Sequence, residues 1–327
     1  MLFTFVLILV LTYSFLNGMN DSGGLVAAAI SSRSMSPRFA HDVAAVAEFT
    51  GPFLFGTAVA AAIGKDLVQP GAISLPVLFV AILSAIAWNV TAWYTGLPSS
   101  STHALLGGLI GAVSIGYGFQ GLYFAGFAKV LLSLFSAPFA GSLAGYAFMR
   151  LTQLLTRNAT PSVNQFFKSA QPFNVIALAL SHGTNDGQKG MGLVAMALVA
   201  AGYENTFVVP FWATLLVAFA LMLGVGIGSS RIMRTVGRRI YKLRPVHAFA
   251  AQTASATVVL GAALLGGPVS TTQVVSTAIM GVGTAERVNA VRWHIAGQIA
   301  TAWLVTIPAS AILAAILGLI WTRWSGL

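Results

Sequence analysis

The stretch Asn17-Gly18-Met19-Asn20-Asp21 returns in the second half of the chain as His182-Gly183-Thr184-Asn185-Asp186. A second, unlike stretch, Pro98-Ser99-Ser100-Ser101-Thr102-His103, returns as Pro268-Val269-Ser270-Thr271-Thr272-Gln273. Two different motifs that recur in the same order at nearly one offset indicate an internal duplication. The sequence therefore predicts a chain built from two related halves.

The composition of the chain is that of a membrane protein. Of its 327 residues, 57% are hydrophobic and only 7% are charged, whereas a soluble domain carries roughly 25% charged residues because its surface faces water. Apolar runs such as 2–16, 44–63 and 207–227 approach or exceed the ~20 residues that cross a bilayer. We therefore expect an all-α polytopic membrane protein, and the composition excludes a soluble enzyme and a nucleic-acid-binding protein.

The apolar runs and their polar interruptions predict about five spans in each half. Both Asn-Asp motifs fall inside long apolar runs, and Gly18 and Gly183 suit an unwound backbone, so we expect these two spans to be broken. The short spans after the Ser/Thr motifs are candidates for re-entrant hairpins, and whether they cross fully stays open. The predicted spans are 2–30 (broken at 17–24), 43–63, 75–95, 98–118, 121–149, 172–201 (broken at 181–190), 207–229, 246–266, 269–285 and 292–318. The division is repeat 1 at 1–149, a cytoplasmic link at 150–171, and repeat 2 at 172–327 with a basic cytoplasmic loop at 230–245.

Basic residues predict the orientation. The positive-inside bias places the basic loop, the link and the two other basic connections in the cytoplasm. With both termini outside, five crossings in each half satisfy these charges, and the second half then enters the membrane opposite to the first. Inverted repeats with interrupted helices are typical of secondary transporters that bind substrate between the repeats. The basic residues used are Arg33, Arg38, Arg150, Arg157, Lys168, Arg231, Arg234, Arg238, Arg239, Lys242, Arg244, Arg287 and Arg292.

The aspartates of the two Asn-Asp motifs are candidates for binding a coupling ion. Asp21 and Asp186 lie within predicted spans, where an ionisable group costs several kcal/mol unless it is paired or binds an ion. With Asn20 and Asn185 they offer the oxygen ligands that Na⁺ prefers, and a proton on the carboxylate is the competing use. The structural alternative is that each aspartate caps a broken helix. The duplication favours a site for H⁺ or Na⁺.

The two Ser/Thr motifs are suited to an anion. Pro98 and Pro268 can begin helices, and hydroxyls near a helix N-terminus line the region where free N–H groups attract negative charge. The alternative is that these hydroxyls only pack between helices, as is common in membranes. Hydroxyl donors beside carboxylate acceptors suit an anion that still carries a proton, which favours phosphate over sulfate. The predicted phosphate ligands are Ser100, Ser101, Thr102, Ser270, Thr271 and Thr272, with Asn20 and Asn185.

Further polar residues are candidates for accessory roles. Glu48 lies in a span, where it could pair with a basic residue or line the path. Lys189 could attract the anion or hold Asp186 in an ion pair. His103 and His182 neighbour the motifs and could take up protons, and a hydrogen-bonded structural role is the alternative. The chain has no cysteine and no zinc, nucleophile-elbow or P-loop motif, so we expect no cofactor, and no metal other than Na⁺ at Asp21 and Asp186.

At these motifs the sequence resembles the PiT family of inorganic phosphate transporters. The family's duplicated Gly-Ala-Asn-Asp-Val-Ala-Asn signature is similar to residues 18–24 and 183–189, and its Pro-x-Ser-Thr-Thr signature is similar to 98–103 and 268–273. The resemblance implies an inverted-repeat carrier, commonly dimeric, in which the Asn-Asp pairs organise the ion and phosphate site and the hydroxyls hold phosphate. It also implies H⁺ or Na⁺ coupling. Some bacterial relatives carry a metal–phosphate complex and some carry sulfate, and many work beside a soluble accessory protein, for which 231–244 is a candidate dock.

Two departures from the family pattern bear on the coupling ion. Where the pattern has a second Asn, this chain has Gly24 in one half and Lys189 in the other, which weakens the case for Na⁺. The short central link fits a compact prokaryotic version. We predict a multi-pass inner-membrane phosphate symporter that works by alternating access and is not an enzyme. The alternatives are a sulfate permease on the same scaffold, a membrane anion-binding or sensor subunit, and a channel.

Overall fold

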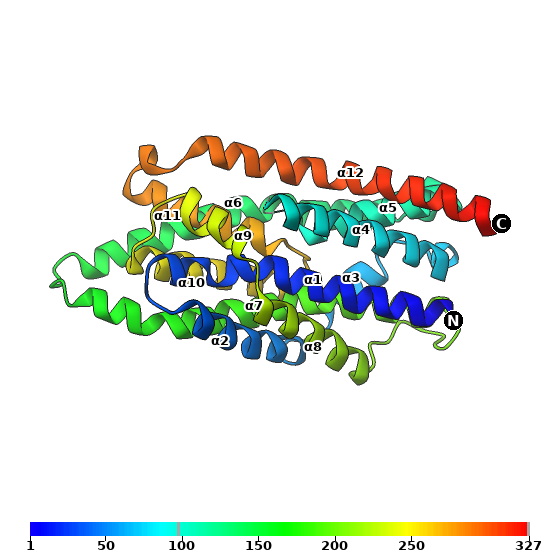
Figure 1. Ribbon diagram of the computed structural model, residues 1–327, viewed down its shortest axis with the longest axis horizontal. Coiled ribbons are helices and arrows are strands. Elements are labelled where there is room, and N and C mark those ends of the chain that lie inside the picture. Colours follow the sequence, from blue (N-terminus) through cyan, green and yellow to red (C-terminus); the bar gives the residue numbers. More distant parts are fainter. Residues whose placement is uncertain (97–98, 326–327) are drawn as a thin grey trace.

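The computed structural model describes residues 1–96 and 99–325, and within these the regular elements are helices, in agreement with the predicted all-α fold. They pack side by side into one elongated bundle (Figure 1). The α-helices are α1 (Leu2–Ser31), α2 (Pro37–Thr50), α3 (Ala58–Gly64), α4 (Leu75–Thr95), α5 (Ser101–Tyr117), α6 (Phe124–Thr156), α7 (Val163–Ala200), α8 (Phe211–Ile227), α9 (Ser230–Arg234), α10 (Pro245–Leu264), α11 (Thr271–Glu286) and α12 (Trp293–Ser325).

Several of the described helices are long and apolar enough to cross a membrane. Five qualify alone, namely α1, α4, α6, α10 and α12, and two bent pairs bring the number to seven. The pairs are α2 with α3, bent by 73°, and α8 with α9, bent by 58°. Helices α5 and α11, with 17 and 16 residues, are shorter than the ~20 residues that a full crossing needs. The chain is therefore a helical membrane protein.

The helices that carry the Asn-Asp motifs are continuous. Helix α1 runs through 17–24 and α7 runs through 181–190, so the predicted breaks at these positions are wrong. Asn17, Asp21, His182 and Asp186 bond to side chains of neighbouring helices, and the backbone of α1 and α7 keeps its own hydrogen bonds. Gly18 and Gly183 serve close packing instead: a Cβ on either would collide with the carbonyl oxygen of Leu221 or of Glu48, respectively.

The helix breaks occur one span later, at 54–57 and at 228–229. Each second piece is capped by a side chain from a motif helix. Gln188 Oε1 accepts hydrogen bonds from the N–H groups of Val59 (2.7 Å) and Ala60 (3.3 Å) at the start of α3. Ser22 Oγ accepts from the N–H of Ser229, at 3.0 Å, at the start of α9. The motif helices thus satisfy backbone donors that a broken span exposes.

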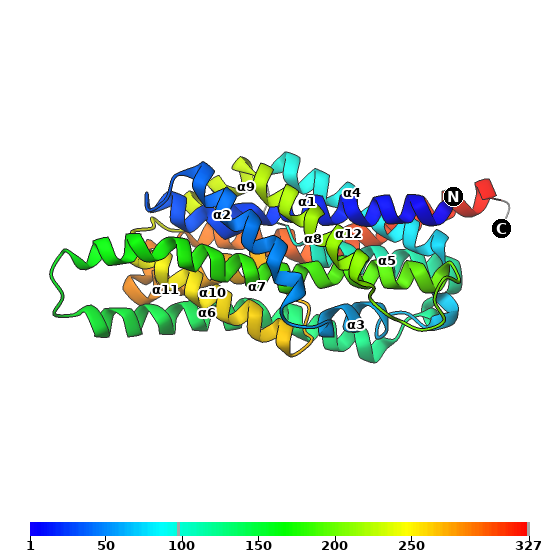
Figure 2. The same ribbon diagram turned by 90° about the horizontal axis from the view of Figure 1, so that it is seen from below.

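Helices α4 with α5, and α10 with α11, form two hairpins on either side of the bundle centre. Figures 1 and 2 both show α4 and α5 towards the end that holds the two chain termini, which we call the terminal end, and α10 and α11 towards the opposite end. Helix α5 packs against α4 and α12, and α11 packs against α10 and α6. Each hairpin therefore packs against the last long helix of the other half of the chain, and the two halves interlock.

The central link is mostly helical. Helix α6 continues to Thr156 and α7 begins at Val163, so only 157–162 connects them. These helix ends project beyond the rest of the bundle (Figure 2). The predicted basic loop at 230–245 also contains helix, α9 followed by a π-helical turn at Thr235–Arg239. We call the end with these basic segments the basic end.

Two apolar cores flank a polar layer. The core towards the terminal end contains Val6 and Val10 of α1. The core towards the basic end contains Leu25 and Val26 of the same helix. Between them α1 buries the residues of its motif, and α7 does the same at 181–190. Because both cores exclude water, every polar group in this layer needs a protein partner or a ligand.

Candidate functional site

Helices α1 and α7 pack against each other in the polar layer. A side chain of each helix contacts the aspartate of the other helix. Asn17 Nδ2 donates a hydrogen bond to Asp186 Oδ2 at 2.8 Å. His182 Nε2 lies 3.2 Å from Asp21 Oδ2. Asn17 and His182 occupy matching positions in the two motifs. The exchange makes one site from both halves, with both aspartates at most 4% exposed.

His182 lies among three carboxylates. Its Nδ1 is 2.7 Å from Glu48 Oε1, and its Nε2 is 3.5 Å from Asp186 Oδ2 as well as near Asp21. A neutral imidazole can donate from only one ring nitrogen, whereas here both face carboxylate oxygens. One further proton, on the ring or on a carboxyl group, satisfies both contacts. The arrangement is suited to holding a proton between the two apolar cores.

Lys189 is fully buried on the other side of Asp186. Its Nζ donates hydrogen bonds to Asp186 Oδ1 at 2.8 Å, to Thr102 Oγ1 at 2.6 Å and to the carbonyl oxygen of Val269 at 2.8 Å. These three contacts use all three donors of an ammonium group. A buried lysine is tolerated only with such compensation, so its position is fixed by the two hairpin tips and by Asp186.

The hydroxyls at the hairpin tips reach the motif helices. Thr272 at the start of α11 donates a hydrogen bond to Asp21 Oδ1, and Ser101 at the start of α5 donates one to Asn17 Oδ1. Thr102 Oγ1 also donates to the carbonyl oxygen of Val269 at 3.2 Å, which joins the tips to each other. The structure thus brings together the first turns of α5 and α11 with both aspartates.

The first turn of α11 has unused hydrogen-bonding capacity. Ser100 Oγ accepts from the N–H of His103 and so caps α5, whereas Ser270 makes no such bond to α11. The hydroxyl of Thr271 is buried and has no hydrogen-bond partner among the described residues. Free N–H groups and an unpartnered hydroxyl at a helix N-terminus are features that suit an anion.

The motif asparagines tie each hairpin to its own half. Asn20 Nδ2 donates to the carbonyl oxygen of Asn89 in α4 at 3.3 Å, and Asn20 Oδ1 is buried without a partner among the described residues. Asn185 Nδ2 donates to the carbonyl oxygen of Gly267 at 3.1 Å, and its Oδ1 accepts from the N–H of Val269 at 3.2 Å. Asn185 is therefore fully engaged in positioning the tip, while Asn20 keeps an oxygen for a ligand.

The predicted site residues do not all meet at one point. His103 bonds to Ser100 (Nδ1 to Oγ, 2.6 Å) and lies edge-on to Phe135, outside the cluster. Pro98 lies outside the described residues. Asn17 lies at the centre of the cluster but was not among the predicted site residues. Its position, which matches that of His182 in the repeated motif, could have identified it. The predicted residues that cluster are Asp21, Glu48, Ser101, Thr102, His182, Asp186, Lys189 and Thr272.

The cluster can hold a cation. One ligand atom from each of Asp21, His182 and Asp186 lies within 4.8 Å of the others. The charged groups around them are the carboxylate of Glu48 and the ammonium of Lys189. Even with His182 protonated, three carboxylates outnumber the cationic groups. With all three carboxylates ionised, the site is net negative before any anion enters.

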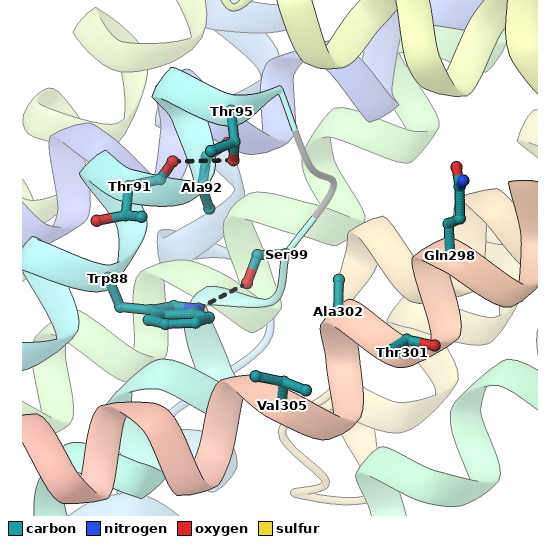
Figure 3. A pocket seen from close by; sticks show the side chains of 9 residues that line it. All are labelled: Trp88, Thr91, Ala92, Thr95, Ser99, Gln298, Thr301, Ala302 and Val305. Carbon is teal, nitrogen blue, oxygen red and sulfur yellow. Dashed lines mark hydrogen bonds between the residues drawn. The ribbon is translucent and has the colours of Figure 1, made fainter.

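A cavity of about 280 Å³ lies beside the tip of the first hairpin, between α4 and α12. Figure 3 shows Trp88 Nε1 directed at Ser99 Oγ, which it meets at 3.0 Å. Thr91, Thr95, Gln298 and Thr301 also line the cavity. Ser99 lies two residues before Ser101, so the cavity reaches the first Ser/Thr motif from outside the cluster.

A second cavity, of about 470 Å³, lies at the basic end and is lined by Arg33, Lys242, Arg244 and Arg292. Beside it, burial and a hydrogen bond donated to Glu286 raise the pKa of the Tyr241 phenol to about 12. The phenol therefore stays protonated and keeps this bond. The basic residues there form a positive surface at one end of the bundle.

The sequence model of the phosphate transporter family matches residues 17–162 and 155–314. The chain belongs to the phosphate transporter family. It is 38% identical over 308 residues to a probable low-affinity inorganic phosphate transporter of Rhizobium meliloti (strain 1021), covering 94% of this chain and 92% of that one. It is 37% identical over 315 residues to a protein with the same description from Bacillus subtilis (strain 168), covering 95% and 94%.

Among solved structures, this family member resembles one described as the sodium-dependent phosphate transporter. The TM-score is 0.88 at 26% sequence identity, and the match covers 98% of this chain and 99% of the other. The predicted family is confirmed, and its named relatives are transporters and permeases rather than enzymes. The bacterial relatives and the apolar helices together support a prokaryotic membrane protein that transports phosphate.

Proposed function

We propose that this protein carries inorganic phosphate across the plasma membrane of a prokaryotic cell together with H⁺ or Na⁺. The observation that carries the proposal is the meeting of two hydroxyl-bearing helix starts with two buried aspartates. Thr102 and Thr272 link the tips of α5 and α11 to the groups around Asp186 and Asp21. The binding site proposed for phosphate lies at this junction, with the coupling ion beside the aspartates.

The chemistry of the junction fits phosphate. Unused donors are the Thr271 hydroxyl and the first N–H groups of α11. The hydroxyls of Ser101, Thr102 and Thr272 can join them when phosphate replaces their present protein acceptors. Acceptors come from the carboxylates of the two motifs. An anion that keeps a proton can donate a hydrogen bond to a carboxylate and also accept hydrogen bonds from the hydroxyls. A fully deprotonated anion can only accept. The site therefore favours phosphate over sulfate.

The charge of the cluster argues for symport. Three carboxylates face one ammonium and one imidazole, and an incoming anion adds further negative charge in a water-poor layer. Uncompensated charge at this depth costs several kcal/mol. A cation that enters with the anion removes that cost, so binding of the two is cooperative. The cation candidates are a proton shared by His182, Glu48 and Asp21, or Na⁺ at Asp21 and Asn20.

The path of the chain supports inverted repeats and alternating access. In each half a long motif helix is followed by a bent span, a hairpin and a last long helix. The hairpin of the first half lies towards the terminal end and that of the second half towards the basic end (Figure 1). Access would alternate as one hairpin and then the other withdraws from the junction. Each half then makes three crossings and one re-entrant hairpin, in place of the five crossings expected from the sequence.

The positive-inside bias supports a cytoplasmic location for the basic end, which puts both termini outside. By likeness to its family we further propose a homodimer in the bilayer. The basic segment 230–245 and the cavity beside it are the proposed dock for an acidic surface of a soluble accessory protein. Light scattering of the detergent-solubilised protein tests the dimer, and a charge-neutralised Lys242→Gln variant tests the dock.

Radiolabelled phosphate uptake into proteoliposomes tests the function. Inward pH and Na⁺ gradients are imposed separately, and excess sulfate, or a divalent metal, is added outside. We expect one of the two gradients to drive accumulation of phosphate that excess sulfate does not block. If uptake requires the divalent metal, the substrate is a metal–phosphate complex. Phosphate binding without flux would contradict a carrier, and flux that neither saturates nor accumulates solute would indicate a channel.

A further inference from the structure

Lys189 and Gly24 stand at matching positions in the two motif helices, each three residues after its aspartate, and they differ in charge. Near Gly24 there is room: a Cβ added there would come no nearer than 4.0 Å to Val275. In the other half the Lys189 side chain is fully buried and extends to Asp186. The same scaffold is therefore open on one side and filled by an ammonium group on the other.

The oxygens around the Lys189 ammonium are of the kinds that bind hard cations. A carboxylate, a hydroxyl and a backbone carbonyl lie 2.6 to 2.8 Å from Nζ. Hard metal cations take the same three kinds of oxygen. The donors of the ammonium are all used, so no further cation can approach Asp186 Oδ1 without displacing Lys189. Na⁺ therefore does not fit at the Asp186 half of the site.

The Asp21 half offers related oxygens without a resident charge. Asp21 Oδ1 contacts Thr272, the residue that matches Thr102, and Asn20 Oδ1 is buried without a partner among the described residues. The facing titratable group is His182, which reaches Asp21 through Nε2 and Glu48 through Nδ1. An exchangeable cation, whether a proton or Na⁺, has a place at this half.

We propose that Lys189 is a built-in cation that substitutes for a free monovalent cation at the Asp186 half, so that the transporter couples phosphate to one fewer free cation than its two matching motifs would provide. The inference rests on the proposed cation-coupled function and deepens it. Lys189 is then a specificity-determining residue for the coupling ion. The solved structure described as sodium-dependent has the same fold at 26% identity, which leaves the choice of ion to individual side chains such as this one.

The test counts radioactive Na⁺ bound to purified protein in detergent, without phosphate. Lys189→Gly recreates the residue found at Gly24, and Lys189→Arg is the matched control that keeps the charge. We expect wild type and Lys189→Arg to bind at most one Na⁺ per chain, and Lys189→Gly to bind one more than wild type. In proteoliposomes without Na⁺, phosphate uptake by Lys189→Gly should fall about tenfold and recover when Na⁺ or methylammonium is supplied.

An equal Na⁺ count in wild type and in a folded Lys189→Gly variant would overturn the proposal. If that variant does not fold, the wild-type count alone decides: two Na⁺ per chain would contradict a built-in cation, and none or one supports it. The Na⁺ count does not depend on flux. Suppose that Lys189→Gly binds one more Na⁺ than wild type but that neither protein takes up phosphate. That result would reject the proposed function and leave the assignment of Lys189 standing.

Discussion

The Asp21 half and the Asp186 half of the site share one scaffold and differ in how their charges are compensated. Asp186 is held by Lys189 and Asn17, whereas Asp21 contacts Thr272 and His182. Glu48 packs against Gly183 of α7, and Leu221 packs in the corresponding way against Gly18 of α1. The two halves therefore also differ here, because one has a carboxylate where the other has a leucine. Under the proposal for Lys189, the Asp186 half holds a fixed cation and the Asp21 half an exchangeable one. Each prediction below compares matching residues in the two halves.

The largest effect is expected from the aspartates. Asp21→Asn and Asp186→Asn should both abolish cation-driven phosphate uptake, but Asp186→Asn should also destabilise the fold by about 3–5 kcal/mol, because it leaves Lys189 buried without its counter-charge. Thermal unfolding in detergent measures the difference. The control Asp186→Asn/Lys189→Met should regain stability without regaining uptake. Equal unfolding temperatures of the two single variants would remove the distinction between the halves, and full uptake in either would exclude that aspartate from the site.

The glycines of the motif helices come next. Gly18→Ala and Gly183→Ala should each cost about 1–3 kcal/mol, because the added methyl group collides with the backbone of a packed helix. Gly24→Ala should not destabilise the protein, since it meets only Val275 at ordinary contact distance. Unfolding temperatures of the three variants check this order. A stable Gly18→Ala variant together with an unstable Gly24→Ala variant would contradict the packing described here.

A smaller effect separates the hairpin hydroxyls. Ser101→Ala removes the hydrogen bond to Asn17 and should cost about 1 kcal/mol of stability. Thr271→Val replaces a hydroxyl that has no partner among the described residues, so it should keep or raise stability while increasing the KM for phosphate several-fold. Uptake kinetics and unfolding measured on the same preparations separate the two roles. Unchanged KM in Thr271→Val would place that hydroxyl outside the phosphate site.

The smallest effects are expected from the capping residues. Ser22→Ala and Gln188→Ala each expose backbone donors of a bent span and should cost about 0.5–2 kcal/mol. Gln188→Ala should cost more, because Gln188 serves two N–H groups and Ser22 serves one. Hydrogen exchange at the first turns of α3 and α9 reports the loss locally. Faster exchange in regions distant from both breaks would argue against a capping role.

Much of the fold could be predicted from the sequence because apolar runs mark where helices cross. The ten predicted spans correspond to ten helices or bent pairs. The helix breaks were misplaced because hydropathy does not reveal whether a buried polar residue such as Asn17 is satisfied by a neighbouring helix or by its own unwound backbone. The packing of α4 with α5 as a hairpin was equally hidden, since a helix of 21 residues has the length of a full span.

The site was predicted in its types of residue but not in its contacts. The duplicated motifs pointed to Asp21, Asp186 and the hairpin hydroxyls because repetition is visible in a single sequence. The exchange of Asn17 and His182 across α1 and α7 was not visible, because it depends on how two distant helices pack. His103 and His182 are both histidines next to a motif, but His103 lies outside the cluster. Position in the sequence alone therefore could not show which of the two belongs to the site.

The most direct test of the account is the affinity of the purified protein for phosphate, measured by calorimetry from about pH 6 to about pH 8, with and without Na⁺. A net negative site that takes anion and cation together predicts that either protons or Na⁺ tighten phosphate binding by about tenfold or more. An affinity that changes with neither, beyond the protonation of phosphate itself, would contradict a shared site and would separate phosphate from the cation that drives it.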